Sequence, residues 1–542
     1  MENFIKTFIK EDLENKRYAK IITRFPPEPN GYLHIGHARA IITDFELAKD
    51  FHGDTNLRYD DTNPSKEDKI YVDNILKDIK WLGYNPKNVF FASNYFDYMY
   101  EKALLLIHKG LAYVDHQSAE EISKTRGNLT QPGTPSVYRN RSIKENLDLF
   151  AKMTSGFYNE GDCVLRAKID MASPNINLRD PAIYRIIKKE HHNTGWKWVV
   201  YPMYDFAHPL EDAYEGISHS LCSLEFEDHR PLYEWVINNC ETIAQPRQIE
   251  FGRLSIENTI MSKRYLLELV NSKKVSGWDD PRLPTLAGMR RRGYTPQSIK
   301  KFILSTGLSK INSIVPQAQL YSCLRDDLVL KAPRLMAVTK PLKVTITNYS
   351  KTELESYEVP INQDNLKLGN KLVYFGPTIY IESEDFSEIK PDKKFKRLSL
   401  NNEVRLLGIG YFIRAHSVIK NEEGQVVEVL ATYDPLTKSG LNFNDRKPDG
   451  TISFLCADKM RRAEFRIYDD LLDPTIESDN ILAKFNVNSL LVYQGFIEES
   501  TKQYRIHNKY QIIRNGYYSV DDDSKPSLIV LNNIVPLKSS YK

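Results

Sequence analysis

The sequence of 542 residues lacks any long hydrophobic segment and contains little cysteine. Its longest uninterrupted apolar run is Ala103–Ile107, far short of the roughly 20 residues that a helix needs to cross a bilayer. We therefore expect no transmembrane helix. The five cysteines form no C-x-x-C pair and are odd in number, which argues against a disulfide framework and a four-thiolate zinc site and favours a reducing cytoplasm. They are Cys163, Cys222, Cys240, Cys323 and Cys456.

The first residues also lack the apolar core of a secretory signal, and Met1–Lys6 predict a short amphipathic helix instead. Neither sign of charge dominates, since 74 Lys and Arg face 71 Asp and Glu. Locally the charge is uneven, because Arg282–Lys310 has seven basic residues and no acid, and Lys390–Arg414 has seven against two acids. Such runs are usually solvated faces, but two of them favour a polyanion track, because neutralising phosphates drives nucleic-acid binding.

The composition is that of a globular protein, with 41% hydrophobic and 27% charged residues, so a largely disordered chain is excluded. Because domains usually hold about 100–200 residues, this length predicts three to five structural units.

The first half of the sequence has an α/β pattern. Lys20–Phe25 and Thr55–Tyr59 are typical of short buried strands, and helical spacing of apolar residues predicts a helix over Gly36–Phe51. A second helix is expected over Asn63–Leu82, with Asn63 as its cap and a proline in its first turn. Alternating strands and helices indicate a parallel, doubly wound sheet.

Two later segments, Lys197–Tyr201 and Gln248–Leu254, resemble further strands of that sheet, so the block from Asn94 to Trp196 is interpreted as an inserted domain. The segment Ser262–Lys331 is predicted to be helical. After Pro333 the pattern changes to short alternating runs, which favour one or two β-barrels. These runs are Leu342–Ile346, Lys371–Phe375, Gln425–Ala431, Leu490–Tyr493, Tyr510–Ile513 and Ser527–Leu531.

The predicted organisation is therefore a Rossmann-like nucleotide-binding fold with a helical subdomain and C-terminal β-barrels. The expected boundaries are 1–93 and 197–256 for the two Rossmann-like halves, 94–196 for the inserted domain, 257–331 for the helical subdomain and 332–542 for two barrels.

The strongest chemical signal is the segment from Arg24 to His37, RFPPEPNGYLHIGH. A strand ends, a proline-rich loop follows, and His34 and His37 stand three residues apart where a helix begins. In an open parallel sheet, ligands bind beyond the carboxyl ends of the strands. A helix start offers unpaired N–H groups to a phosphate, and Gly36 leaves room for a flat base. Alone, a His-x-x-His pair is more often structural; in this context it predicts charge stabilisation at a phosphorus centre.

A second signal is Met261-Ser262-Lys263-Arg264, which follows the strand predicted at Gln248–Leu254. A lysine on a mobile loop can neutralise the charge that builds on a leaving pyrophosphate. Alone this motif is weak, since a solvated loop lysine is common.

Together these two signals are typical of class I aminoacyl-tRNA synthetases, and the chain resembles the glutaminyl-tRNA synthetase family in particular. The shared segments run in order through most of the first ~310 residues: RFPPEPNGYLHIGHA, LRYDDTNP, LTQPG, LRAKIDMASPN, YPMYDFAH, SHSLCSLEFEDHR, MSKR, GWDDPRLPT and RRRGYT. The later part matches more loosely, through APRLMAV, KRLSL and EVRL. The usual five-residue lysine motif appears as Ile260–Arg264 with a single lysine, the form expected in the glutamine/glutamate branch.

The resemblance implies a class I fold with an acceptor-stem domain inserted at 94–196. It implies activation of L-glutamine by ATP and transfer to the 2′-hydroxyl of the terminal adenosine of tRNA(Gln), with bound tRNA required for activation. It assigns catalysis to His34, His37 and Lys263. The residues implied to border ATP are Glu28, Pro29, Asn30, His34, Gly36, His37, Ser223, Arg253, Leu254, Met261, Ser262 and Lys263. Mg²⁺ is expected on the ATP phosphates, without a protein cage.

For the amino acid, the resemblance points to Arg24, Asp60, Tyr204, His208 and Cys222. Asp60 follows a strand and can pair with the substrate ammonium, Arg24 can hold a substrate oxygen, and the family places the tyrosine hydroxyl on the side-chain amide. The sheet rule independently expects such groups at one edge. Without the motifs, a capping aspartate, a surface arginine and a core tyrosine are about equally plausible.

A glutamate-specific relative is the principal alternative. A carboxylate side chain favours a bidentate arginine, whereas a carboxamide needs one donor and one acceptor. Where the glutamyl branch usually carries arginine, this chain has Cys222, and His208 fits the glutaminyl pattern. The sequence therefore favours glutamine.

The resemblance also implies contacts to tRNA. Asp228 would meet a minor-groove guanine amino group, although a surface aspartate is equally plausible. The positions matching anticodon-reading residues are Lys310, Arg334, Arg397, Gln511 and Arg514, the last three in weaker matches. We expect neither DNA nor a membrane as partner, and a monomer.

Other functional classes fit less well. A nucleotidylyltransferase is far shorter, a truncated glutamyl relative that modifies a tRNA base would lack everything after about Pro333, and a non-catalytic tRNA-binding paralogue would tolerate loss of His34, His37 or Lys263, all of which are present.

Overall fold

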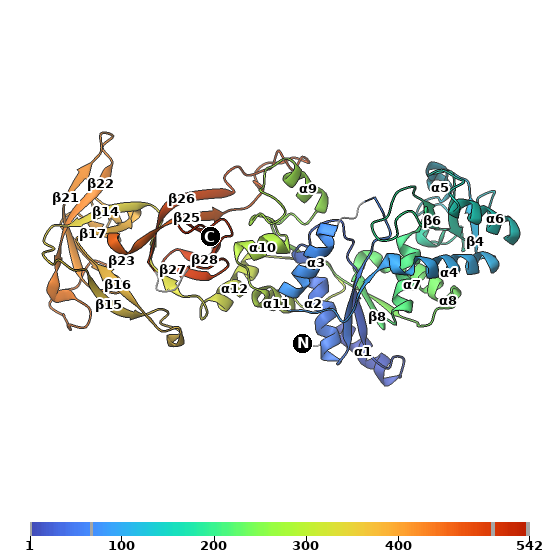
Figure 1. The fold of residues 1–542 in the computed structure, drawn as a ribbon, viewed down its shortest axis with the longest axis horizontal. Helices are drawn as coiled ribbons and strands as arrows, with labels where there is room; N and C mark the ends of the chain where they lie inside the picture. Colours follow the sequence, from blue (N-terminus) through green and yellow to red (C-terminus); the bar gives the residue numbers. More distant parts are fainter. Residues whose placement is uncertain (1–2, 66–68, 500–503, 538–542) are drawn as a thin grey trace. The chain divides into compact units, whose positions relative to one another are not determined.

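The computed structural model describes residues 3–65, 69–499 and 504–537 of the chain. These residues divide into two compact units. Unit 1 comprises Met1–Ile256 together with Ile303–Val315, and unit 2 comprises Glu257–Phe302 together with Pro316–Lys542. Figure 1 shows the ribbon and labels many of its helices and strands.

Unit 1 is built on five parallel strands. Strands β1 (Ile22–Phe25), β2 (Asp54–Tyr59) and β3 (Val89–Phe91) pair in parallel, as do β8 (His219–Ser223) and β9 (Arg247–Phe251). The two groups meet where the Ser218 N–H donates to the Ile22 carbonyl at 2.9 Å. The resulting order β3-β2-β1-β8-β9 places the third strand at one edge and the first in the middle, as in doubly wound folds, and confirms the predicted α/β class.

The strands and helices around His34 follow the predictions closely. Helix α2 (Ile35–Asp50) buries Ile41, Ile42 and Phe45, the apolar residues whose spacing predicted it. The predicted amphipathic N-terminal helix is α1 (Phe4–Glu14), which buries Ile5 and Ile9 in the cluster that contains Leu221 and Phe251.

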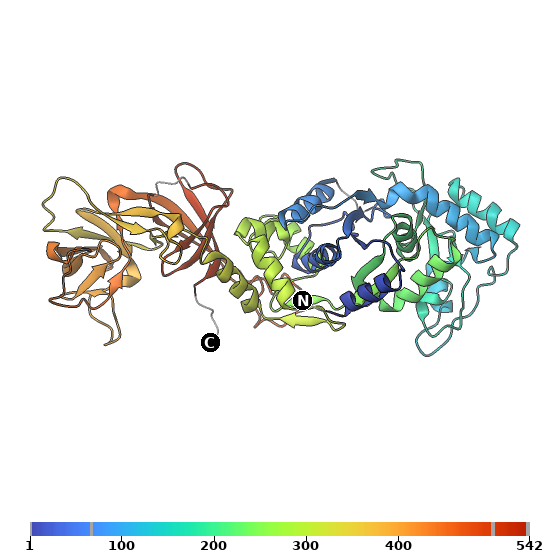
Figure 2. The same cartoon turned by 90° about the horizontal axis from the view of Figure 1, so that it is seen from below.

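The inserted domain has its own antiparallel sheet, ordered β4-β5-β6-β7. Its strands are β4 (Ala112–Asp115), β5 (Val164–Ala167), β6 (Ala182–Ile186) and β7 (Val200–Pro202), and its helices are α4 (Phe96–His108), α5 (Ala119–Thr125) and α6 (Ile143–Thr154). Helices α4 and α6 lie close to each other in both views (Figures 1 and 2) and share one core. Their core also includes residues of α7 (Tyr204–Tyr214) and α8 (Arg230–Asn239). This shared core connects the insert to the parallel half of the unit.

One strand joins a different sheet from the one predicted. The segment Lys197–Tyr201 was expected in the parallel sheet, but β7 pairs antiparallel with β6, with Tyr184 opposite Pro202. The chain folds back at a bridge between His191 and Gly195, so the returning strand lies beside β6. A short apolar run does not specify its sheet. The fourth parallel strand is β8, which we did not predict.

Two further boundaries differ from the predictions. Strand β9 ends at Phe251, because Gly252 lies so close to the Ile311 carbonyl that a Cβ would be 2.0 Å from its oxygen. Leu254 then begins β10 (Leu254–Ile256), which pairs with β11 (Ser313–Val315). Residues 63–65 are not helical, and Asn63 accepts the Ser65 N–H in a turn. Helix α3 (Lys69–Trp81) is described from Lys69, and residues 66–68 lie outside the described residues.

The helical segment predicted over Ser262–Lys331 is confirmed. It contains α9 (Lys263–Asn271), α10 (Leu286–Arg292), α11 (Pro296–Ser305) and α12 (Gln317–Leu328). Lys263 was expected on a loop, but it is the first residue of α9, with Ser262 at the cap position.

Two seven-stranded sheets form the remainder of unit 2. One is ordered β12-β27-β28-β29-β25-β26-β13 and the other β23-β20-β21-β22-β14-β17-β24. In the first, the edge strands β12 (Arg334–Leu335) and β13 (Ala337–Val338) are separated only by Met336; in the second, β23 (Thr451–Ile452) and β24 (Leu455–Cys456) are two residues apart. Because chain continuity holds both edges of each sheet together, each closes into a barrel. This confirms the two predicted barrels.

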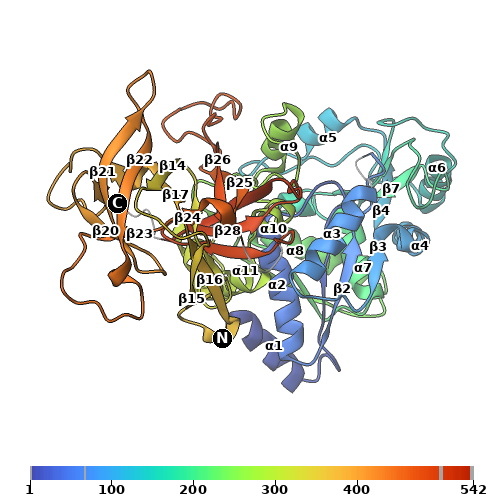
Figure 3. The ribbon, with the colours of Figure 1, turned by 60° about the vertical axis from the view of Figure 1, so that its left-hand side comes forward.

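All six runs predicted as strands are found in these barrels or in the hairpin beside them. The first barrel also contains β25 (Met460–Tyr468), β26 (Leu490–Glu498), β27 (Lys509–Ile512), β28 (Gly516–Val520) and β29 (Ile529–Pro536). The second also contains β14 (Pro341–Ile346), β17 (Thr378–Glu382), β20 (Glu403–Leu406), β21 (Phe412–Lys420) and β22 (Val426–Asp434). Two small pairs complete the unit, β15 (Glu355–Pro360) with β16 (Asn370–Phe375) and β18 (Phe386–Ser387) with β19 (Leu398–Ser399). Strands β21 and β22 extend as a long hairpin in Figure 3.

The structure also bears on the predictions made from absences. The five cysteines all have free thiols, and no described helix is long and apolar enough to cross a bilayer. The five domain boundaries proposed from the sequence stay predictions.

Candidate active site

Residues predicted to bind ATP and residues predicted to bind glutamine line one cavity of about 160 Å³ in unit 1. Glu28, Pro29 and Asn30 come from the loop after β1, Asp60 follows β2, and Tyr204 begins α7. The structure thus brings part of the predicted ATP set and part of the predicted glutamine set together, beyond the carboxyl ends of two adjacent parallel strands, as the sheet rule requires.

The carboxyl group of Asp60, which lines this cavity, has a raised pKa. Its carboxylate accepts hydrogen bonds from the Thr62 hydroxyl at 2.8 Å and the Thr62 N–H at 3.3 Å. Burial raises its pKa to about 6, the Thr62 hydrogen bonds oppose this shift, and the neighbouring Glu28 adds to it. An approaching ammonium group would favour the ionised form, so the site is suited to bind a cation.

His34 and His37 form a closely packed pair at the start of α2. Nδ1 of His34 accepts the Gly36 N–H at 3.1 Å, and Nδ1 of His37 accepts the His34 N–H at 3.1 Å. The ring centroids are 3.9 Å apart. Because both Nδ1 atoms act as acceptors, each neutral ring carries its proton on Nε2. The start of α2 therefore holds two imidazole N–H donors beside the positive end of the helix dipole.

The charge state of His34 follows from its surroundings. Burial, with a smaller contribution from the nearby Arg253 guanidinium, lowers the pKa of His34 to about 4. The ring is thus neutral at pH 7 and can donate a hydrogen bond to a phosphoryl oxygen, but it is a poor source of a proton.

Arg253 and Ser223, both expected near ATP, are connected through Glu225. The Ser223 hydroxyl donates to Glu225 at 2.9 Å, and the Arg253 guanidinium forms an ion pair with the same carboxylate. The Ser313 N–H donates to the Arg253 carbonyl. Since alternate residues of a parallel strand face opposite sides, Leu254 turns its N–H and carbonyl away from β11, the orientation that a backbone contact to adenine requires.

Arg24, expected to hold a substrate oxygen, is completely buried. Its Nε donates to Asp212 at 3.0 Å, Nη1 to the Leu221 carbonyl at 2.8 Å and Nη2 to the Ser220 hydroxyl at 2.6 Å. In this structure its donors are used inside the protein, so direct contact with a substrate stays a prediction.

Asp212 is the centre of this buried network. It also accepts from Arg58 Nη2 at 2.8 Å and from the Tyr233 hydroxyl at 3.0 Å. Burial alone would raise its pKa, but Arg24, His208 and Arg58 hold it well below its ordinary range. Asp212 therefore remains an anion that compensates two buried guanidinium groups.

His208 packs between these arginines and Tyr204. Nε2 is 2.8 Å from Nη2 of Arg24, and Nδ1 is 3.1 Å from Nη2 of Arg58. Since a neutral imidazole has one acceptor nitrogen, only one of these contacts is a hydrogen bond. Burial, together with the two guanidinium groups, lowers the pKa of His208 to about 3, so the ring is uncharged.

Tyr204 and Cys222 are also neutral groups. The Tyr204 ring stacks on His208 with centroids 5.0 Å apart, and burial raises the pKa of its hydroxyl far above the ordinary value. Burial likewise raises the pKa of the half-buried Cys222 thiol, whose sulfur is 4.0 Å from the Ile249 carbonyl. None of these three side chains offers a cation to a substrate carboxylate.

The remaining predicted ATP contacts belong to unit 2. Met261 precedes α9, Ser262 occupies its cap position and Lys263 its first turn, where Ser262 and Lys263 are exposed.

The predicted tRNA residues fall into separate groups. In unit 1, the Asp228 side chain is exposed while its carbonyl accepts Asn175 and Asn177, and Lys310 lies over the Phe4 ring at 5.4 Å. In unit 2, four of them form two pairs. Arg334 lies opposite Gln511 in β12 and β27 and donates to it at 3.0 Å, and Arg397 and Arg514 both contact the buried Asp385.

Arg397 and Arg514 line a strongly basic cavity of about 390 Å³ with Lys394 and Lys396. The cations come from two segments far apart in sequence. The tertiary structure therefore collects part of the basic run predicted at Lys390–Arg414 around one opening, a suitable arrangement for a phosphate or an unstacked base.

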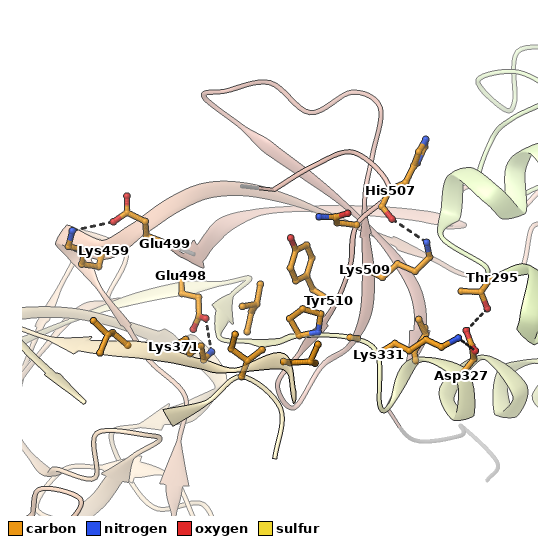
Figure 4. Close-up of a pocket in the computed structure, with 18 of the residues that line it drawn as sticks. Thr295, Asp327, Lys331, Lys371, Lys459, Glu498, Glu499, His507, Lys509 and Tyr510 are labelled. Atoms are coloured by element: carbon orange, nitrogen blue, oxygen red, sulfur yellow. Dashed lines mark hydrogen bonds and ion pairs between the residues drawn. The ribbon is translucent and has the colours of Figure 1, made fainter. Parts of the chain in front are cut away.

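A larger cavity of about 700 Å³ in unit 2 was not predicted (Figure 4). Lysines in its wall pair with acids, such as Lys371 with Glu498 at 2.6 Å and Lys459 with Glu499 at 3.3 Å. Lys509 donates to the His507 carbonyl at 3.1 Å. Because most of these cations are neutralised by their own neighbours, the lining does not resemble the open basic cavity beside Arg514.

One group of side chains has the spacing of a metal site. Asp61, His191 and His192 bring one ligand atom each within 4.8 Å of one another. However, His191 Nε2 is 2.7 Å from the Asp61 carbonyl, while its Nδ1 accepts the Asn193 and Thr194 N–H groups. Both ring nitrogens are therefore already used, and this cluster fits a metal ion poorly.

Sequence reasoning missed the buried polar groups behind the pocket, in particular the charged Arg58 and Asp212 and the neutral Tyr233. The available signal was weak, since it consisted of Asp212 following His208 by four residues, the spacing of one helix face. Charged residues are mostly exposed, so without coordinates nothing indicated that Asp212 points inward to two strand arginines.

Comparisons with known proteins identify the family of this chain. The catalytic-domain model of "tRNA synthetases class I (E and Q)" matches residues 20–329, and the models of their anti-codon binding domain match residues 332–434 and 451–521. A glutamine–tRNA ligase of Clostridium perfringens is 55% identical to this chain, and those of Clostridium kluyveri and Clostridioides difficile are 53% and 52% identical, each over 100% of this chain and 98% of the relative. The chain therefore belongs to the class I tRNA synthetases of the glutamate and glutamine branch, and within that branch to the glutamine–tRNA ligases.

Proposed function

We propose that this chain joins L-glutamine to tRNA(Gln) in two steps at the cavity of unit 1. First, a carboxylate oxygen of glutamine attacks the α-phosphorus of ATP and displaces pyrophosphate. Next, the 2′-hydroxyl of the terminal adenosine attacks the activated carbonyl and displaces AMP. The carrying observation is that Glu28–Asn30 and Asp60 with Tyr204 line one cavity, because the first step requires both reactants to meet.

In this proposal His34 and His37 stabilise the transition state as hydrogen-bond donors. Their Nδ1 atoms accept backbone N–H groups, so each neutral ring carries its donor hydrogen on Nε2, and in this proposal these donors bond the oxygens on which negative charge develops. Lys263, which follows Met261 and Ser262, supplies an ammonium group to the leaving pyrophosphate. No covalent intermediate on the protein is needed.

Glutamine would be selected by the neutral groups of the pocket. Ionised Asp60 pairs with the substrate ammonium, and the protonated Tyr204 hydroxyl bonds the side-chain amide. Cys222 and His208 are both uncharged at neutral pH, as their shifted pKa values indicate. A glutamate side chain would find no cation among Tyr204, His208 and Cys222 and would lose its hydration without compensation there.

Mg²⁺ enters this scheme bound to ATP, where it neutralises phosphate charge. We assign no resident metal to the chain, because both ring nitrogens of His191 in the metal-like cluster at Asp61 are already used and Mg²⁺ prefers oxygen ligands.

For tRNA, we propose that the insert at 94–196 binds the acceptor stem, with Asp228 on a minor-groove guanine. The anticodon would be read by Lys310, by the pair of Arg334 and Gln511, and by Arg397 and Arg514. We further propose a monomer that works in the cytoplasm, where its five free thiols stay reduced.

The decisive experiment is charging of purified tRNA(Gln) with glutamine and with glutamate in parallel, together with pyrophosphate exchange with and without tRNA. We expect charging with glutamine, little with glutamate, and exchange that depends on tRNA. Preferential charging with glutamate would refute the substrate assignment, and tight tRNA binding without any exchange would refute catalysis.

A further inference from the structure

The inserted domain contributes an arginine to the wall of the active-site cavity. Arg185 belongs to β6, where it lies opposite Val164 of β5 and Tyr201 of β7. Its neighbours Tyr184 and Ile186 are buried in the core of the insert. Because successive side chains of a strand alternate between faces, Arg185 points away from these two, and it lines the cavity that also contains Glu28 and Asp60.

Arg185 differs from the other arginine of this sheet. In β5, the fully buried Arg166 donates to the Asp180 carbonyl at 2.6 Å and to Asp115 at 2.7 Å. By contrast, Nε of Arg185 is buried without a hydrogen-bond partner. Among the described residues, the side chain of Arg185 has neither a hydrogen bond nor an ion pair. A partly buried guanidinium left in this state is costly, so its natural complement is an anionic ligand.

The charges of the cavity indicate which anion is needed. Glu28 and Asp60 are both acids, and an α-amino acid carries its ammonium and its carboxylate on the same carbon atom. If Asp60 holds the ammonium, the carboxylate must lie nearby, where two acids would repel it unless a cation compensates. Arg24, the expected holder of a substrate oxygen, has its donors engaged with Asp212 and its neighbours.

We infer that Arg185 binds the α-carboxylate of the incoming amino acid. This inference rests on the proposed function and adds a substrate-contacting residue to it. A guanidinium offers two parallel N–H donors to a carboxylate. The contact exists before reaction and weakens as the attacking oxygen forms its bond to phosphorus and loses its charge. Removing it therefore raises the KM for glutamine more than it lowers kcat.

The test compares the binding of two ligands to the wild-type protein and to three variants. Binding of L-glutamine and of L-glutaminol, in which a CH₂OH group replaces the carboxylate, is measured by competition dialysis on the enzyme–tRNA complex for wild type, Arg185→Gln and Arg185→Lys. We expect Arg185→Gln to weaken the binding of glutamine by about ten- to a hundredfold and to leave the binding of glutaminol unchanged. Arg185→Lys, which keeps the charge, should weaken glutamine less. Lys197→Gln, an exposed cation of the same insert paired with Asp97, is the matched control and should alter neither.

Two further readouts separate this role from a structural one. Because Arg185 has no partner to lose among the described residues, Arg185→Gln should not lower the midpoint of thermal unfolding, whereas loss of a structural arginine would. Equal weakening of both ligands would overturn the inference, as would unchanged glutamine binding with weakened tRNA binding, which would make Arg185 a phosphate contact. These measurements do not depend on catalysis, so a failure of the proposed function appears separately, as absent charging by wild type.

Discussion

Replacing Asp212 by asparagine tests the buried charge network behind the glutamine pocket. Asp212 forms the ion pair of Arg24, at 3.0 Å, and one of the three ion pairs of Arg58, all inside the protein. Arg58 keeps Glu211 and Glu215 in the variant, but Arg24 is left as a buried cation without a paired acid. Breaking a buried pair by removing one partner typically costs about 3–5 kcal/mol, and we expect Asp212→Asn to lose that much stability in unit 1.

Native-state hydrogen exchange of the full chain measures this loss, because peptides from α7 and β8 report on unit 1 separately from unit 2. The matched control is Asp326→Asn, the same chemical change in an ion pair with Lys301 whose side chains are 55% and 56% exposed; such pairs contribute about 0–1 kcal/mol. The double variant Arg24→Gln with Asp212→Asn should recover part of the loss, since both charges are gone. If Asp212→Asn costs no more than the control, the reasoning is wrong.

Three further predictions concern activity. His37→Ala should slow adenylate formation by roughly a hundredfold while tRNA affinity in filter binding stays the same; equal losses in both would contradict the assigned role. Since Asp60 must be ionised to pair with an ammonium and burial raises its pKa to about 6, kcat/KM for glutamine should fall as the pH drops through that value, and Asp60→Asn should abolish this dependence in a pH series. Arg514→Ala should weaken tRNA binding whether or not glutamine is bound, and it should reduce by about one the slope of the logarithm of the binding constant against the logarithm of the salt concentration. An unchanged slope in a salt titration would exclude a phosphate contact.

The sequence predicted the elements that depend on local pattern. Helix α2, strand β2 and five of the barrel strands (β14, β22, β26, β27 and β29) follow from the spacing of apolar residues, and turn residues mark their ends. That the loop after β1 and Asp60 meet at one cavity was also predictable, because strand ends of a parallel sheet share one edge. The resemblance then added roles that spacing alone does not supply.

Long-range pairing decided the rest. The run at Lys197–Tyr201 is equally suited to a parallel or an antiparallel sheet, and only the fold-back at His191–Gly195 placed it beside β6. Whether a charged residue is a solvated side chain, a buried counter-ion or a ligand contact depends on neighbours that are more than a hundred positions away. Arg24 and Arg185 both occur on short strands, yet the first is surrounded by acceptors and the second lines a cavity. That difference is a property of packing in three dimensions, because desolvation and pairing, not the identity of the side chain, set what a buried charge can do.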